Sequence, residues 1–369
     1  MTVVGVLGAG QLGRMLALAG YPLGLRFLFL DESADAPAGH LGDLTVAAWD
    51  DRAALDAFAE NVDLVTYEFE NVPLATAEHL AARVPVFPPP RALAVAQDRL
   101  KEKTLFRELG IGTAPFAAVD SRDELDRAIA AIGLPAVLKT RTQGYDGKGQ
   151  RMLRRREDVE PAFATLGETP LILEGFIPFE RELSILAARN RAGETAFWPL
   201  VENVHRDGIL RLSIAPALCT DGAQDKEAVA IATKALQALD YVGVLAIELF
   251  QHEGRLLANE MAPRVHNSGH WTIEGATTSQ FENHLRAILD LPLGATTPTG
   301  VSAMVNLIGR TPDSSAILGI DGAHLHLYGK PARPGRKLGH VTLVRSDHAE
   351  LESVLARVAT LVDEPSLRR

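Results

Sequence analysis

Residues 136–150 read AVLKTRTQGYDGKGQ and decide the fold expected for this chain. A short apolar run ends at Lys139, and a loop containing Gly144, Gly147 and Gly149 follows soon after it. Because glycine has no Cβ, the backbone N–H groups of such a loop can close over phosphate oxygens. The lysine adds a point charge from the neighbouring strand. The loop lacks the Gly-Lys-Ser/Thr of a Walker motif, so the pattern predicts either another kind of triphosphate site or a plain glycine-rich turn.

Composition restricts the class of protein. The chain has 369 residues, enough for two or three domains, with 47% hydrophobic and 23% charged residues, as in ordinary globular proteins. Its single cysteine, Cys219, excludes an intrachain disulfide and fits a reducing compartment. A net charge of −10 argues against nucleic acid or an anionic membrane as a partner. The N-terminus lacks a signal-peptide pattern and no apolar run is as long as a membrane span, so we expect a cytoplasmic protein.

Strands alternate with helices in the first part of the chain. Val3–Leu7, Arg26–Leu30 and Leu64–Phe69 read as buried parallel strands with helices between them. This alternation predicts an open, doubly wound, Rossmann-like domain over residues 1–95. A helix from about Ala92 to Leu109 is expected to lead out of it.

Three further parts follow. Residues 96–178 predict a small α+β lobe around the glycine loop. Residues 179–295 predict a strand-rich large lobe with a helix near Ala223–Leu239, and they end in a Pro/Thr/Gly-rich linker at Leu289–Thr299. Residues 296–369 predict a small, mostly β C-terminal domain.

A glycine motif follows the first strand. Gly8-x-Gly-x-x-Gly13, with Asp31 about 20 residues later, satisfies the dinucleotide fingerprint and predicts NAD or FAD. The physical content of the motif is broader, because a helix N-terminus offers N–H groups and a dipole to any anion. A single phosphate would therefore suit it as well as a pyrophosphate.

Two acidic strands point to a metal. Glu248 lies in the apolar strand Ala246–Phe250, and Asn259 and Glu260 end the next strand. The turn at Glu253-Gly254 is about midway, so a hairpin would bring the two glutamates side by side. Their carboxylates would repel each other unless a cation lay between them. Oxygen ligands without His or Cys favour Mg²⁺, with phosphates completing its coordination.

Together these motifs resemble an ATP-grasp ligase, in which two lobes clamp ATP and paired acids hold Mg²⁺. More narrowly, the chain resembles the 5-(carboxyamino)imidazole ribonucleotide synthases of purine biosynthesis over nearly its whole length. The segments that carry this resemblance are Gly10–Met15, Tyr67–Asn71, Gly144–Gly147, Glu260–Trp271 and Tyr328–His340. The resemblance implies that ATP, bicarbonate and 5-aminoimidazole ribonucleotide give ADP, phosphate and the N-carboxylated ribonucleotide through carboxyphosphate, usually in a homodimer.

The resemblance also implies roles for individual residues. Glu248 and Glu260 would hold Mg²⁺. The residues implied around ATP are Arg99, Lys139, Gly144, Tyr145, Asp146, Gly147, Lys148, Gly149, Gln150, Glu174, Gly175, Phe176, Ile177, Glu182, His205, Asn259 and Glu260.

The substrates would occupy the rest of the site. Arg264 and His266, with Asn267, would hold bicarbonate and then carboxyphosphate. Asp146 would orient the amine or accept its proton, and Lys330 would hold the phosphate. The residues implied around the ribonucleotide are Gly10, Gln11, Leu12, Glu68, Tyr145, Ser268, Lys330, Arg336 and Lys337.

One position departs from the family's pattern. The glycine loop of the family commonly reads Tyr-Asp-Gly-Arg, and Lys148 replaces that arginine here. Lysine keeps the charge but loses the bidentate fork, so a contact to a planar carboxylate would be weaker or rearranged. Three alternative functions stay open: a formate-dependent glycinamide ribonucleotide transformylase, an NAD-dependent oxidoreductase, and a nucleotide sensor without turnover.

Overall fold

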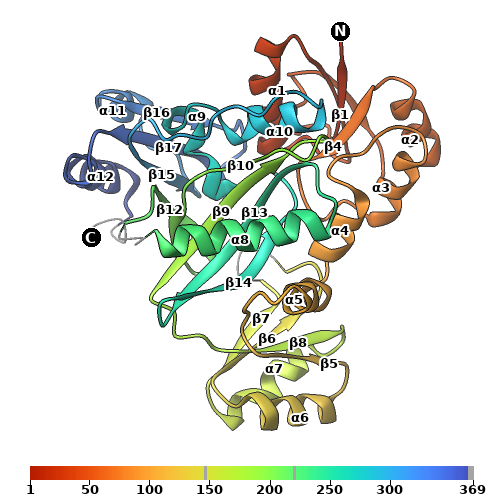
Figure 1. Cartoon of the computed structure of the whole chain (residues 1–369), viewed down its shortest axis with the longest axis vertical. Coiled ribbons are helices and arrows are strands. Elements are labelled where there is room, and N and C mark those ends of the chain that lie inside the picture. The colour runs from red at the N-terminus through yellow and green to blue at the C-terminus, as the bar shows by residue number, and fades with distance from the viewer. Residues whose placement is uncertain (145–147, 219–221, 365–369) are drawn as a thin grey trace.

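The computed structural model describes residues 1–144, 148–218 and 222–364. Tyr145, Asp146, Gly147 and Cys219 therefore lie outside the described residues. Three sheets organise the chain, and the one nearest the glycine loop belongs to a small lobe that projects from the rest of the molecule (Figure 1). Within the described ranges, no helix is both long and apolar enough to cross a membrane.

The N-terminal sheet is parallel and has the strand order β3-β2-β1-β4. It confirms the predicted strands and adds a short edge strand, β3. Because the strands are parallel, the carboxyl ends of β1, β2 and β4 meet at one edge of the sheet, which brings Gly8, Asp31 and Glu68 to that edge. The elements are β1 (Val3–Leu7), α1 (Gln11–Gly20), β2 (Arg26–Asp31), β3 (Asp43–Val46), α2 (Arg52–Ala59), β4 (Leu64–Tyr67) and α3 (Leu74–Ala81).

The single helix predicted from Ala92 to Leu109 is wrong. Two helices, α4 (Pro90–Ala96) and α5 (Arg99–Glu108), replace it. The break comes at Asp98, whose backbone is extended and whose side chain accepts hydrogen bonds from the N–H groups that begin α5. Such a cap contributes about 1 kcal/mol. The new start of α5 places Arg99 in its first turn, facing the predicted nucleotide site.

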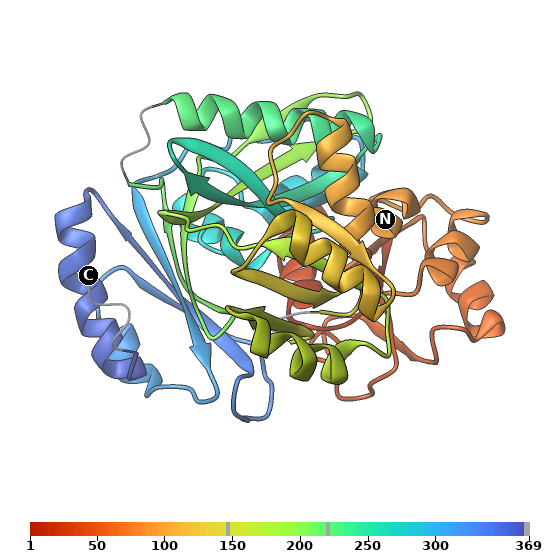
Figure 2. The ribbon, with the colours of Figure 1, turned by 90° about the horizontal axis from the view of Figure 1, so that it is seen from below.

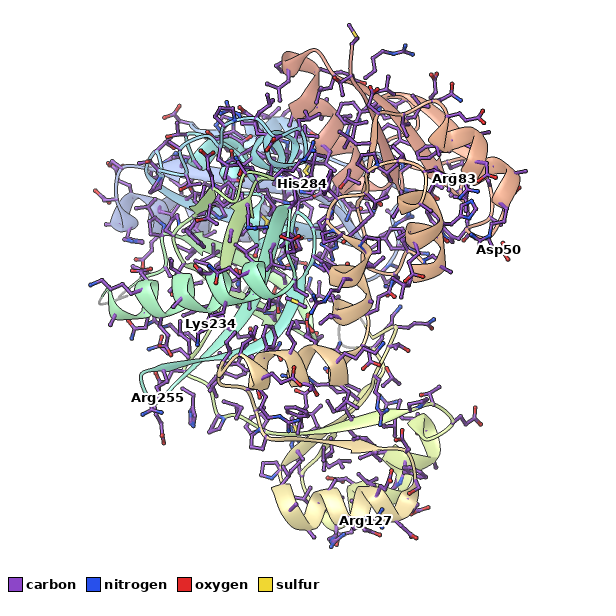
Figure 3. The ribbon with its side chains drawn as sticks, turned by 45° about the vertical axis from the view of Figure 1, so that its right-hand side comes forward. Asp50, Arg83, Arg127, Lys234, Arg255 and His284 are labelled. Carbon is purple, nitrogen blue, oxygen red and sulfur yellow. The ribbon has the colours of Figure 1, made fainter. Side chains whose placement is uncertain are left out.

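The small lobe is an antiparallel sheet with the order β5-β8-β6-β7 and two covering helices. Its elements are β5 (Phe116–Val119), α6 (Arg122–Ile132), β6 (Ala136–Thr140), β7 (Gln150–Leu153), α7 (Val159–Leu166) and β8 (Leu171–Gly175). Lys139 lies near the end of β6, as predicted, and Gln150 opposite it begins β7, so the glycine loop connects two paired strands. Arg127, labelled in Figure 3, marks the outer face of this lobe on α6.

A nine-stranded sheet forms the centre of the molecule, in the order β14-β13-β9-β11-β12-β15-β17-β16, with β10 paired to β9. The predicted C-terminal strands join this sheet, because β12 pairs with β15. The strands are β9 (Arg181–Arg189), β10 (Thr195–Phe197), β11 (Val201–Arg206), β12 (Ile209–Ala215), β13 (Gly243–His252), β14 (Arg255–Ala262), β15 (Val301–Ile308), β16 (Ala323–Leu327) and β17 (Lys337–Arg345).

Helices cover the faces of this central sheet. The predicted helix near Ala223 is confirmed as α8, which crosses β9 and β13 in Figure 1 and buries an apolar face against them. The other helices are α9 (Thr272–Gly275), α10 (Gln280–Ile288), α11 (Ser314–Leu318) and α12 (His348–Val362), and α8 spans Ala223–Ala238.

His284 of α10 joins the central sheet to the N-terminal sheet, and Figure 3 shows it in the interior between them. Its Nδ1 accepts a hydrogen bond from the N–H of Val244 at 3.1 Å, and its Nε2 lies 2.9 Å from the Thr66 hydroxyl. Burial lowers the pKa of this histidine to about 3, so it is neutral. These contacts fix the N-terminal domain against the large lobe.

Candidate active site

Residues that lie in or directly after strands of all three sheets line a cleft of about 750 Å³. Figure 2 shows the ribbon from below, with the small lobe in front of the central sheet. Most of the predicted site residues line this cleft. They are Gln11, Leu12, Glu68, Arg99, Lys139, Gly144, Lys148, Gln150, Glu174, Gly175, Phe176, Ile177, Glu182, His205, Glu248, Asn259, Glu260, Arg264, His266, Asn267 and Lys337. Residues more than 300 positions apart in the chain therefore share one cavity.

The acidic hairpin forms as predicted. Glu248 of β13 is the register partner of Glu260 of β14, and the turn at Glu253-Gly254 joins the strands. Burial and the neighbouring charge of Glu260 raise the pKa of Glu248 to about 7. Burial also opposes ionisation of Glu260, but Arg99, whose guanidinium donates to it at 2.9 Å, lowers its pKa. Arg99 thus stabilises the charge of Glu260, and a further cation would stabilise the charge of Glu248.

The hairpin fits a hard divalent cation that shares its ligands with phosphate. Glu248, Glu260 and Asn259 offer oxygen atoms in one wall of the cleft. Among the described residues, no group of three or more His, Cys, Asp or Glu side chains could hold a metal alone. The remaining ligands would come from phosphate and water, as is usual for Mg²⁺.

The opposite wall of the cleft is built around Glu174, at the end of β8. Its Oε2 lies 3.0 Å from Lys139 Nζ and 3.2 Å from Nζ of Lys103 on α5. Burial would raise the pKa of Glu174, but the two lysines and Arg99 lower it to about 2. Our sequence reasoning missed Lys103. Its position one helical turn after Arg99 was the available signal, because residues four apart share a helix face.

An aromatic pair lies in the cleft with Phe176 and Ile177, two of the residues implied around ATP. Phe179 and Phe250 stack with ring centroids 4.6 Å apart and an interplanar angle of 3°. Both rings line the cleft with Phe176 and Ile177. Our sequence reasoning missed this pair, although Phe250 is two residues after Glu248 in a strand and so faces the same side.

The glycine loop is held by its ends. The N–H of Thr140 donates to the carbonyl of Gly149 at 2.8 Å, and Arg99 donates to the carbonyl of Gly144 at 3.3 Å. Gly149 has φ +69°, a conformation that favours glycine, and a Cβ there would meet the Thr140 hydroxyl at 2.6 Å. Gly149 therefore shapes the loop and is not itself part of the cleft lining.

Glu182 and His205 form a close pair in the floor of the cleft. His205 Nδ1 lies 2.6 Å from Glu182 Oε2, across the paired strands β9 and β11. Burial alone would lower the pKa of His205, but this hydrogen bond raises it. The histidine is thereby favoured as a cation next to Glu248, which it helps to neutralise.

Arg264 and His266 follow the acidic hairpin and face the cleft. The Arg264 guanidinium pairs with Glu70, which also lines the cleft and which our sequence reasoning did not select. Burial and the Arg264 charge lower the pKa of His266 to about 3, so its imidazole is neutral. Its Nδ1 accepts from the N–H of Ser268 at 3.3 Å, which leaves Nε2 as a donor, 3.5 Å from Glu248.

The prediction that Ser268 contacts the ribonucleotide needs correction. Ser268 is fully buried, and its hydroxyl lies 2.9 Å from both the Ser184 hydroxyl and His266 Nδ1. It supports His266 from behind instead of lining the cleft. Asn267 does line the cleft, and its side-chain amide pairs with that of Asn306 at 2.7 Å.

The first glycine motif also differs from the expectation. Glu68 occupies it, since its carboxylate accepts from the N–H groups of Gly10 at 2.8 Å and Gly13 at 2.9 Å. Asp31 accepts from the N–H of Ala9 at 2.8 Å. The predicted phosphate contact of Gly10 is therefore corrected, because its N–H already has an acceptor. The carboxylates of Glu68 and Asp31 also occupy the N–H groups that would bind the pyrophosphate of NAD or FAD.

The next two N–H groups of α1, from Gln11 and Leu12, have no acceptor among the described residues. The ammonium of Lys330 contacts the Gln11 side chain. Burial and the nearby charges of Arg336 and Lys337 lower the pKa of Lys330 to about 8, although Glu68 opposes this. Lys330 therefore lies beside a helix N-terminus, with Arg336 and Lys337 near enough to act on its charge, an arrangement that suits a phosphate dianion.

Comparison with known proteins gives this site a family. The ATP-grasp domain matches residues 104–281, the ribonucleotide synthetase preATP-grasp domain residues 1–97, and the phosphoribosylaminoimidazole carboxylase C-terminal domain residues 302–354. The N5-carboxyaminoimidazole ribonucleotide synthase of Pseudomonas aeruginosa is 54% identical over 98% of this chain and 99% of its own. The chain belongs to the N5-carboxyaminoimidazole ribonucleotide synthase family.

Solved structures of the family agree with this fold. The synthetase from Thermus thermophilus has 59% identity and a TM-score of 0.95, covering 98% of this chain and 99% of its own. The Aspergillus clavatus synthase, solved in complex with ADP and 5-aminoimidazole ribonucleotide, has 34% identity and a TM-score of 0.91, covering 98% of both chains. The predicted ATP-grasp fold, with its N-terminal Rossmann-like and C-terminal domains, is confirmed, and the chain is an ATP-dependent ligase of this family.

Proposed function

We propose that this protein uses ATP and bicarbonate to carboxylate the amine of 5-aminoimidazole ribonucleotide, in the cytoplasm and as a homodimer. Membership of the synthase family supports the reaction, and one observation of the structure supports it most directly. Glu248 and Glu260 lie side by side in a cleft that also contains Lys139 and the N-terminus of α1. A nucleotide, its cation and a ribonucleotide phosphate can thus be held in one cavity.

Glu248 and Glu260 would hold Mg²⁺, which when bound neutralises charge on the transferring phosphoryl group. Lys139 would align the triphosphate, and the ring pair of Phe179 and Phe250 would hold the base. Arg264 and the Nε2–H of neutral His266 would bind bicarbonate. Its oxygen would attack the γ-phosphorus in line, the bond to the β-phosphate oxygen would break, and carboxyphosphate and ADP would form.

The second step would join the two substrates. The Gln11 and Leu12 N–H groups, with Lys330 and Arg336, would hold the ribonucleotide phosphate. The exocyclic amine would attack the carboxyl carbon of carboxyphosphate, inorganic phosphate would leave, and the amine would lose a proton. Asp146, the acceptor that the sequence predicts for this proton, lies outside the described residues and stays a prediction.

The test is release of phosphate from ATP in the presence of bicarbonate, with and without 5-aminoimidazole ribonucleotide. We expect the ribonucleotide to stimulate release strongly and formate to fail as a replacement for bicarbonate. Unchanged release upon addition of the ribonucleotide would count against the proposal, and formate-dependent turnover of glycinamide ribonucleotide would favour the transformylase alternative. Light scattering tests the proposed homodimer by measuring the molar mass in solution. The mass of a monomer would contradict it.

A further inference from the structure

Glu174 is a buried carboxylate, and two lysines lie within ion-pair distance of the same one of its oxygens. Lys139 Nζ and Lys103 Nζ lie 3.0 Å and 3.2 Å from its Oε2. Its other oxygen, Oε1, is buried and has no hydrogen-bond partner among the described residues. One cation would suffice to balance this carboxylate, so the second lysine requires an explanation.

The two lysines differ in their access to the cleft. The Lys139 side chain is 12% exposed and lines the cavity, whereas the Lys103 side chain is 1% exposed and is not part of the lining. Lys139 comes from β6 beside the glycine loop, and Lys103 comes from α5 behind the wall. Only Lys139 can therefore reach a ligand in the cleft.

Binding of a triphosphate changes the balance of charges in this wall. If Lys139 turns towards phosphate oxygens, it loses its contact with Glu174. A buried carboxylate without a counter-ion is strongly destabilising, so affinity would be lost unless another cation remained beside it. Arg99 also lowers the pKa of Glu174, but it forms no ion pair with that carboxylate, because its guanidinium donates to Glu260 and to the carbonyl of Gly144.

We propose that Lys103 is a positioning residue that stays paired with Glu174 and thereby releases Lys139 to bind the triphosphate. The proposal rests on the proposed function, since it assumes that Lys139 contacts ATP. In the free protein either lysine can balance Glu174, and in the nucleotide complex only Lys103 remains. Loss of Lys103 therefore weakens the complex and not the free protein.

The experiment measures the affinity of the magnesium complex of a non-hydrolysable ATP analogue by calorimetry, together with thermal unfolding of the free protein. Lys103→Met should weaken binding by about 10- to 100-fold, because Glu174 then has no ion-pair partner left in the nucleotide complex. Lys101→Met is the matched control, since Lys101 is exposed on the same helix, and it should bind normally. Lys103→Arg should recover most of the affinity.

A variant of Glu174 itself distinguishes a positioning role of Lys103 from general structural damage. In a Glu174→Gln background the wall holds no negative charge, so adding Lys103→Met should change affinity by less than about 3-fold. An equal loss in both backgrounds would overturn the proposal, as would normal binding by Lys103→Met. A Lys103→Met protein that fails to fold would also overturn it, because Lys139 should suffice in the free state. Normal binding by Lys139→Met would instead refute the proposed triphosphate site.

Discussion

The two walls of the cleft carry opposite excess charge. Around Glu174, Lys103 and Lys139 approach one carboxylate, so that wall is cationic. On the hairpin, Glu248 and Glu260 lie opposite each other, and of these two carboxylates the Arg99 guanidinium donates to that of Glu260. Each wall is electrostatically incomplete by itself. In the proposed reaction a triphosphate with its magnesium ion would complete both, so the cleft would be preorganised for charge that the ligand supplies.

The largest effect should come from the acidic wall. Glu260→Gln keeps the shape of the side chain but removes the charge that would hold Mg²⁺, so ribonucleotide-dependent phosphate release should fall at least about 10³-fold. Glu78→Gln on the exposed face of α3 is the control and should retain full activity. Near-normal turnover of the Glu260 variant would remove this residue from the metal site.

The cationic wall should respond through nucleotide affinity. Lys139→Met removes the charge expected on the triphosphate and should raise the KM for ATP by about 10- to 100-fold. The KM for the ribonucleotide, whose phosphate is proposed to bind near Lys330, should change much less. Steady-state kinetics with each substrate varied in turn makes the measurement, and a parallel rise in both constants would contradict the separation.

A third cationic region, around Lys330, should act on the ribonucleotide alone. Lys330→Ala should raise the KM for this substrate about 10-fold, the value of one charge-assisted contact, and leave the KM for ATP nearly unchanged. The pKa of Lys330 in the free site is about 8, so its charge is complete below that pH and is lost above it. The KM for the ribonucleotide should therefore rise above about pH 8, and a profile that stays flat well into the alkaline range would refute the contact.

The smallest effect is expected for His284, whose shifted pKa affects the stability of the fold and not the substrates. His284 lies away from both walls and has a pKa near 3, against about 6.5 when unfolded. Its stabilising contribution is complete above about pH 6.5 and falls as pH drops towards 3, by about 1.4 kcal/mol per pH unit. His284→Gln should flatten the pH dependence of the free energy of unfolding in that range. His324→Gln, at an exposed position on β16, should leave the slope unchanged, and a slope that His284→Gln does not alter would refute this account.

The pairing of the two acidic strands could be predicted from the sequence, but their register could not. A regular hairpin closed by the turn at Glu253-Gly254 would set Glu248 opposite Asn259, and a β-bulge next to Glu248 shifts the register so that Glu260 lies opposite it. The strand before the glycine loop was predicted from the short apolar run that ends at Lys139. The resemblance to a ligase family added the substrates, which no local pattern specifies.

The features that were missed depend on contacts between distant segments. Lys103 looks like any helical lysine until α5 is packed against β8, and Glu70 acquires its partner Arg264 from 194 residues away. Glu68 is likewise implied as a ribonucleotide contact until the folded chain shows its carboxylate accepting from the N–H groups of Gly10 and Gly13. The break at Asp98 is a local signal that helix periodicity obscured. The proposed domain boundaries stay predictions.

The most direct test of the central claim is an anomalous-difference map from crystals grown with ADP and Mn²⁺ as a substitute for Mg²⁺. The account predicts a peak between the carboxylates of Glu248 and Glu260, with the β-phosphate among the ligands of the ion. An ordered nucleotide whose metal lies elsewhere in the cleft, with those two side chains uncoordinated, would contradict it.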